Sequence, residues 1–190
     1  MLTLYLTRHG ETVENAAGIL QGQTPGQLNH TGIQQARQLR GLLSDTHFDA
    51  LVYSDLKRAV DTAEIINERL GLPLVPCKLF RERDWGEFTG WKVTNIRVKP
   101  QDFPPSIENP ERLARRAADF ISFLIQNFEE GKHILAVGHG YFNRCIVAYM
   151  EGKAVHDVPR WGNAEVRIIQ IDRNHLPQQK TIINGEVSAD

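Results

Sequence analysis

The sequence predicts an α/β fold in which a mainly parallel central sheet carries helices on both faces. Short apolar runs, typical of buried strands, alternate along the chain with longer segments whose apolar residues recur every three or four positions, as in helices. The composition is that of a folded globular protein, with 41% hydrophobic and 24% charged residues, which excludes a disordered chain. The length of 190 residues fits one domain, so we expect residues 1–190 to form a single unit.

The expected strands are short apolar runs bounded by polar or turn-forming residues. They are residues 2–6, 50–53, 74–75, 134–137, 166–171 and 181–183. Continuous apolar runs of this kind are typical of strands that are buried on both faces. Parallel strands need long crossovers, and the helical segments between most of these runs would supply them.

The expected helices begin near capping residues and carry one apolar stripe each. Thr31 and Ser54 are expected to cap the first two helices. The third begins near Glu111, and the fourth follows residues 138–140 and extends to about Met150.

Between about residues 80 and 110 the periodic pattern fails. Four prolines fall within residues 100–110, and proline interrupts both helices and central strands. This segment is therefore expected to be a loop or an insertion rather than a further layer of the fold.

The charge balance limits the classes of partner. Lys plus Arg number 22 and Asp plus Glu number 23, a net charge of −1, so the chain has no electrostatic footprint for nucleic acid or for an anionic membrane. Trp85, Trp91 and Trp161 are expected in the core or in pocket walls, because no basic track accompanies them. With no signal-like or membrane-spanning run, we expect a cytoplasmic protein. The sequence alone does not define its oligomeric state.

Metal and cofactor motifs are missing from the sequence. Cys77 and Cys145 show no CxxC spacing and are expected to be small buried residues. The seven histidines form no HxxxH or HExxH pair, and no glycine-rich nucleotide motif occurs. They are His9, His30, His47, His133, His139, His156 and His175. We therefore expect neither a metal site nor a cofactor.

Polar clusters directly follow three of the expected strands. They are Arg8-His9-Gly10-Glu11-Thr12, Ser54-Asp55-Leu56-Lys57-Arg58 and Gly138-His139-Gly140. In a sheet of parallel strands these positions meet at one edge, where ligands bind. Arginine forks match phosphate oxygens, histidine is a nucleophile or acid–base group near neutrality, and glycine admits a ligand to the backbone. Each cluster alone is more often a surface turn, and Arg58 alone is an ordinary exposed cation. Together they predict a phosphoryl-transfer pocket.

These clusters and several further motifs resemble, in order, those of the histidine phosphatase superfamily, also called phosphoglycerate mutase-like. The motifs are Leu6-Thr7-Arg8-His9-Gly10-Glu11-Thr12 with Asn15, Gln21-Gly22, Gly32-Ile33-Gln34-Gln35-Ala36, Ser54-Asp55-Leu56-Lys57-Arg58-Ala59, Glu82-Arg83-Asp84-Trp85-Gly86, Val137-Gly138-His139-Gly140 and, more weakly, Asn163-Ala164. The resemblance implies a phosphoglycerate mutase-like fold, with the 80–110 segment near the active site.

The resemblance also implies a role for each site residue. His9 would be the nucleophile that forms a phosphohistidine, while Arg8, Arg58 and His139 would surround the phosphoryl oxygens. Glu82 would donate the proton to the leaving group, with Glu11, Asp84 and Glu87 as competing carboxylates. The residues expected to line the phosphate or substrate pocket are Asn15, Gln21, Gly22, Gly140 and Tyr141.

Three positions depart from the family pattern and concern the substrate. Ile19 stands where many relatives carry arginine, and the segment 25–28 reads Pro-Gly-Gln-Leu. Tyr141 replaces the usual small residue; it would narrow the pocket mouth, offer a face to a planar group, or pack under the loop. The leaving group is therefore open among sugar phosphates, phosphoglycerates, ribazole phosphate and phosphoproteins.

The function expected from these motifs is that of a metal-independent phosphomonoesterase acting on a small phosphate ester through a phosphohistidine on His9. One alternative is a phosphoglycerate mutase with the same phosphoenzyme, and another is a phosphate-binding or signalling module without turnover. Only 56 residues separate Glu82 from His139, and 51 follow His139, which leaves little chain for the covering segment of a mutase.

Overall fold

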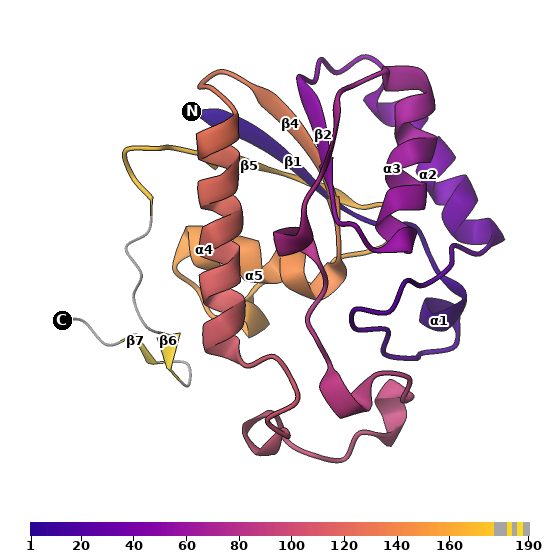
Figure 1. The fold of residues 1–190 in the computed structure, drawn as a ribbon, viewed down its shortest axis with the longest axis vertical. Helices are drawn as coiled ribbons and strands as arrows, with labels where there is room; N and C mark the ends of the chain where they lie inside the picture. The colour runs from indigo at the N-terminus through magenta and orange to yellow at the C-terminus, as the bar shows by residue number, and fades with distance from the viewer. Residues whose placement is uncertain (177–181, 184–185, 188–190) are drawn as a thin grey trace.

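Five strands form one sheet in the computed structural model, which describes residues 1–176, 182–183 and 186–187. Their order in the sheet is β3-β2-β4-β1-β5, at the centre of Figure 1. The strands are β1 (Leu2–Arg8), β2 (Ala50–Tyr53), β3 (Leu74–Pro76), β4 (His133–Gly138) and β5 (Val166–Ile171). The first four are parallel, and β5 runs antiparallel to β1. The predicted mainly parallel sheet is confirmed.

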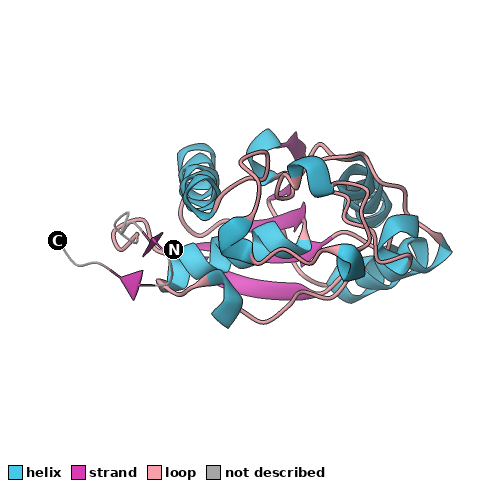
Figure 2. Cartoon of the chain, turned by 90° about the horizontal axis from the view of Figure 1, so that it is seen from below, coloured by secondary structure: helices cyan, strands magenta, loops and turns pink. Residues whose placement is uncertain are grey.

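Helices cover both faces of the sheet, as Figures 1 and 2 show. On one face lie α2 (His30–Leu43) and α3 (Lys57–Leu70), and on the other lie α4 (Pro110–Asn127) and α5 (Gly140–Glu151). The central strand β4 serves both cores, because Ile134 packs in the α4–α5 cluster and Leu135 in the α2–α3 cluster. Burial on both faces explains why the sequence of this strand is continuously apolar.

Two helix starts differ from those that the sequence predicts. The side chain of Asn29, not that of Thr31, caps α2 by accepting the backbone N–H of Gly32 at 2.8 Å. Helix α3 has Leu56 at its N-cap and no side-chain cap, so Ser54 lies two residues ahead of the cap position, and its hydroxyl contacts His139. Thr31 and Ser54 are good caps in isolation, so these starts are decided by tertiary contacts.

Short elements complete the described chain. Helix α1 (Val13–Ala16) is one turn, and five 3₁₀ turns occur: η1 (Lys78–Phe80), η2 (Gly86–Phe88), η3 (Val93–Asn95), η4 (Pro100–Asp102) and η5 (Val155–Asp157). The last strand expected from the sequence is β6 (Ile182–Ile183), which pairs with β7 (Glu186–Val187); Thr181 lies outside the described residues.

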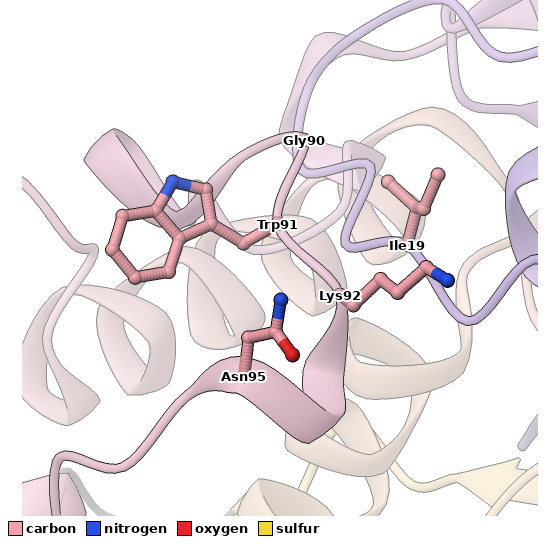
Figure 3. Close-up of a pocket in the computed structure, with 5 residues that line it drawn as sticks. All are labelled: Ile19, Gly90, Trp91, Lys92 and Asn95. Atoms are coloured by element: carbon pink, nitrogen blue, oxygen red, sulfur yellow. The ribbon is translucent and has the colours of Figure 1, made fainter.

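The segment between β3 and α4 pairs with the loop after α1. The backbone N–H of Leu20 donates to Trp91, and that of Gly90 donates back to Leu20. Beside this pairing is a surface pocket of about 530 Å³ lined by Ile19, Gly90, Trp91, Lys92 and Asn95, shown in Figure 3. Trp91 thus lies in a pocket wall, as expected, whereas Trp161 is buried.

Both cysteines are buried free thiols, and burial raises the pKa of the Cys145 thiol to about 12. Among the described residues, no helix is long and apolar enough to span a membrane.

Candidate active site

The strand ends bring the three polar clusters together at one edge of the sheet. In the register, Arg8 pairs with Gly138 and Tyr53 with Val137, so the residues that follow β1, β2 and β4 are neighbours. The backbone N–H of His9 donates to the Gly138 carbonyl at 3.0 Å. The rings of His9 and His139 lie 5.2 Å apart, centroid to centroid.

His9 is held as a neutral imidazole whose Nε2 carries a lone pair. Its Nδ1 lies 2.7 Å from the carbonyl oxygen of Gly10, which only accepts, so Nδ1 holds the proton and donates. Nε2 in turn accepts from Nε of Arg58 at 3.2 Å. Burial, then the charges of Arg58 and Arg8, hold the pKa of His9 well below its ordinary value of 6.5. A neutral imidazole, whose Nε2 lone pair carries no proton, is the nucleophilic form.

Arg58 is a buried cation rather than an exposed one, with a relative exposure of 1%. Besides His9, it donates to the carbonyls of Thr24 at 2.6 Å and Gly22 at 2.8 Å. Burial lowers the pKa of its guanidinium to about 10, so it remains charged at neutral pH. The carbonyls of the 22–25 loop therefore fix the fork beside the nucleophile.

Two buried nitrogens at this edge have no hydrogen-bond partner among the residues that the structure describes, Nε of Arg8 and Nδ1 of His139. Arg8 is otherwise fixed by its Nη1, which donates to the Trp161 carbonyl at 2.9 Å. Burial, then nearby charges of which Arg58 is the largest, hold the pKa of His139 well below 6.5. Buried polar groups are rarely left unpaired, so these atoms are the ones that an anionic ligand would satisfy.

Two glycines allow close packing around the site. A Cβ on Gly140 would lie 3.1 Å from Nε of Arg8, so this residue leaves room for the guanidinium. A Cβ on Gly10 would lie 2.4 Å from the carbonyl oxygen of Gly32, so the loop after β1 packs backbone to backbone on α2.

The loop after α1 contributes the other expected pocket residues. Asn15 forms a capping box with Thr12, and its Oδ1 accepts from Nδ2 of Asn163 at 3.4 Å. Gln21 is buried, and its Oε1 has no partner among the described residues. Gly22 adopts φ +52°, a left-handed conformation that favours glycine, and offers its carbonyl to Arg58.

Glu82 lies at the N-terminus of α5, directly beside the His139 turn. Its carboxylate accepts the backbone N–H of Tyr141 at 3.2 Å, Phe142 at 3.0 Å and Arg83 at 2.8 Å. A helix N-terminus favours a carboxylate in this position. Its negative charge also raises the pKa of Arg8 and of Arg58, which partly offsets the lowering by burial.

The competing carboxylates are occupied by local contacts. Glu11 accepts from the Asn29 amide at 2.7 Å, Asp84 accepts the N–H of Gly86, and Glu87 accepts from the Ser106 hydroxyl. Asp84 and Glu87 are exposed.

Tyr141 packs under the 80–110 segment. Its ring meets that of Trp85 edge to face at 5.8 Å, and the guanidinium of Arg83 lies over it at 5.0 Å. Of the three alternatives for Tyr141, these contacts agree with the one in which its ring packs under the loop.

Sequence reasoning missed three side chains that support the site. Thr62 accepts the N–H of Gly10 and donates to the Arg58 carbonyl, and Ser54 contacts His139. Arg116 donates to the Glu82 carbonyl at 3.3 Å. A fourth residue, Asn163, gave only a weak motif match, yet its amide donates to the His9 carbonyl at 3.0 Å. The described residues contain no group of three or more His, Cys, Asp or Glu that could hold a metal ion.

The chain is similar to known phosphatases and mutases along most of its length. It is 38% identical over 153 residues to an uncharacterized phosphatase, PhoE of Bacillus subtilis, covering 80% of this chain and 79% of that protein. It is 30% identical over 189 residues to a probable phosphoglycerate mutase, GpmB of Enterobacter sp. (93% and 87% covered). It is 31% identical over 198 residues to a metal-independent phosphoserine phosphatase of Arabidopsis thaliana (96% and 79% covered).

A solved structure is also similar to this chain. Bacillus stearothermophilus YhfR superimposes with a TM-score of 0.84 at 27% identity, covering 99% of this chain and 98% of that one. The family model of the histidine phosphatase superfamily (branch 1) matches residues 4–183. The chain therefore belongs to the histidine phosphatase superfamily.

Proposed function

We propose that this phosphatase hydrolyses a small phosphate monoester through a phosphohistidine on His9. The observation that carries the proposal is the buried, neutral His9, whose unprotonated Nε2 accepts a hydrogen bond from the fixed guanidinium of Arg58. Beside it, Arg8 and His139 present buried nitrogens without partners among the described residues. A phosphate group offers oxygen acceptors and negative charge, which match these donors.

In the first step, Nε2 of His9 attacks phosphorus and the bond from phosphorus to the ester oxygen breaks. Arg8, Arg58 and His139 stabilise the charge on the other phosphoryl oxygens as the group transfers. One preorganised donor of this kind contributes on the order of 100–1,000-fold to the rate. Two arginines and a histidine supply here the charge stabilisation that Mg²⁺ supplies in kinases, so the step needs no metal.

Glu82 handles the proton in both steps. As an acid it protonates the departing ester oxygen, which leaves as an alcohol. As a base it then takes a proton from the water that attacks phosphorus, and the nitrogen–phosphorus bond breaks to release phosphate and neutral His9. The amides of Tyr141 and Phe142 hold its carboxylate in place for this exchange.

The other pocket residues support the phosphate rather than react. Asn15, Gln21, Gly22, Gly140 and Tyr141 line the approach to the site in this proposal. The substrate is a small phosphate ester, as it is for the phosphoserine phosphatase relative. Phosphoglycerate mutase activity is the second candidate function, because relatives named as probable mutases match most of the chain.

The test is covalent labelling of His9. The His9→Ala protein should lose turnover of an aryl phosphate by on the order of 10⁴-fold or more, because the nucleophile is gone. In wild type, rapid quenching with a ³²P-labelled ester should trap an acid-labile, base-stable label that the variant lacks. The control is His47→Ala, whose side chain is 83% exposed; it should keep both label and turnover. A label that persists on the folded His9→Ala protein would overturn the assignment.

A further inference from the structure

Ser54 lies directly after β2, at the edge of the sheet that holds both active-site histidines. The residue is fully buried, and its Oγ lies 2.7 Å from Nε2 of His139. Its backbone N–H donates to the carbonyl of Val137 at 3.0 Å, so two neighbouring strands fix its position. The resemblance to the histidine phosphatase superfamily implied no role for this serine. Its side chain does not cap helix α3 either.

The Ser54–His139 hydrogen bond has two forms, which differ in the position of one proton. A neutral imidazole carries a proton on one nitrogen only. In one form Nε2 donates to Ser54, and Nδ1 is then an acceptor. In the other the Ser54 hydroxyl donates to Nε2, and Nδ1 is then a donor. The backbone N–H of Leu56 also points at Oγ, at 3.4 Å, and fills an acceptor site there. The hydroxyl proton remains available for Nε2.

A phosphoryl ligand selects between these two forms. Its oxygens are acceptors, and Nδ1 of His139 is buried without a partner among the described residues. A lone pair on Nδ1 would repel a phosphoryl oxygen, whereas an N–H there would donate to it. The useful form is therefore the one in which Ser54 donates.

We infer that Ser54 is a positioning residue for phosphoryl transfer: its hydroxyl donates to Nε2 of His139 and thereby holds the imidazole proton on Nδ1. This inference rests on the proposed function, since the phosphoryl oxygens are what require a donor at Nδ1. Ser54 itself does not touch the reacting atoms.

The position of the proton is measurable without turnover. In protein labelled with ¹⁵N-histidine, long-range proton–nitrogen spectra distinguish protonated from unprotonated ring nitrogens. We expect the neutral His139 of the wild type to carry its proton on Nδ1, and Ser54→Ala to shift the population toward Nε2. Ser54→Thr, which keeps the hydroxyl, should retain the wild-type form. A wild-type proton on Nε2 overturns the inference whether or not any phosphate ester is hydrolysed.

Kinetics separate a positioning role from a loss of structure. Ser54→Ala should lower kcat by about 10- to 100-fold, with a smaller change in KM. Ser54→Thr keeps the hydroxyl and should keep a kcat close to that of the wild type. Added to His139→Ala, the Ser54→Ala change should cost no further activity, because both act through one imidazole. The matched control is Thr3→Val, which removes a nearly buried strand hydroxyl that contacts Gln170 instead of a histidine. An equal loss in the His139→Ala background, or full activity of Ser54→Ala, contradicts the inference. Should Ser54→Ala not fold, the wild-type spectrum and Ser54→Thr decide.

Discussion

At His9, burial and neighbouring charge act in the same direction. Water is excluded from the ring, and Arg58 and Arg8 repel a second positive charge, so both effects favour the neutral imidazole. The Gly10 carbonyl then fixes the remaining proton on Nδ1. A side chain whose ordinary pKa of 6.5 lies close to neutrality is thus kept in the neutral form that the proposed nucleophile requires.

The same burial makes stability depend on pH. The folded state keeps His9 and His139 neutral below their ordinary pKa of 6.5, whereas the unfolded chain takes up a proton at each. The free energy of unfolding should therefore fall as the pH drops from 6.5 to 5, with a contribution from each of the two histidines. Urea unfolding at several pH values measures this slope.

The matched variant for that experiment is His9→Gln, which removes one of the two titrations. Its slope between pH 6.5 and 5 should be about half that of the wild type. A stability that does not change over this range would contradict the neutral state of the two rings.

Glu82 should matter most for substrates with poor leaving groups. Glu82→Gln cannot protonate the ester oxygen, so hydrolysis of an alkyl phosphate should slow far more than that of an activated nitrophenyl ester, which hardly needs a proton. Glu87→Gln, which changes an exposed competing carboxylate, should affect neither rate. Equal slowing of both esters by Glu82→Gln would move the proton transfer to another group.

At the scale of elements, α4 positions the loop that carries Glu82. Arg116 of this helix donates to the carbonyls of Leu79, Arg81 and Glu82 and forms an ion pair with Glu108 at 2.6 Å. The paired side chains are only 14% and 12% exposed. The N-terminus of α5 holds the carboxylate of Glu82. Helix α4 therefore fixes the backbone carbonyl of Glu82, and helix α5 fixes its side chain.

Arg116→Met should therefore weaken both the fold and the site. The change removes the ion pair of Glu108, whose carboxylate keeps the N–H of Asp84, and it leaves the loop carbonyls without this donor. Losing hydrogen bonds to a charged group of this kind costs about 1.5–3 kcal/mol. Urea unfolding should detect that loss, and hydrolysis of alkyl phosphates should fall more than that of aryl phosphates. The neighbouring Arg115 is exposed, so Arg115→Met serves as the control with little effect on either. A stability loss below 1 kcal/mol in Arg116→Met would contradict this role.

At the scale of the whole molecule, the cover over the site is thin. Between residues 80 and 110 the structure has only the 3₁₀ turns η2, η3 and η4, and most side chains from 91 to 100 are exposed. A mutase must keep water from its phosphohistidine until the second substrate accepts the phosphoryl group. This architecture favours water as the acceptor.

With 3-phosphoglycerate and a bisphosphate primer, we expect release of phosphate to exceed isomerisation. Both products are measured in one reaction, as inorganic phosphate and 2-phosphoglycerate. The His9→Ala protein should form neither, which ties both activities to one intermediate. Isomerisation a hundredfold faster than release would show that the short 80–110 segment does exclude water.

The sequence by itself determined the fold class, the strand positions and the convergence of Arg8, His9, Arg58 and His139. Strand and helix patterns are local, because burial on one or two faces repeats every two to four residues. A parallel sheet then places the ends of its strands at one edge whatever the loops do. Membership of the histidine phosphatase superfamily, predicted from the ordered motifs, is confirmed by the family model.

Only the tertiary structure decided the contacts that tune the site. The hydroxyl of Ser54 contacts His139 instead of capping the helix as predicted. The amide of Asn163 donates to the carbonyl of His9, which is 154 positions away in the sequence. The proton on His9 also depends on the fold, because burial and the distance to Arg58 set the pKa of the ring. Hydrogen bonds and desolvation act through space over a few ångströms, so they follow the register and packing of whole elements rather than the spacing of residues in the sequence.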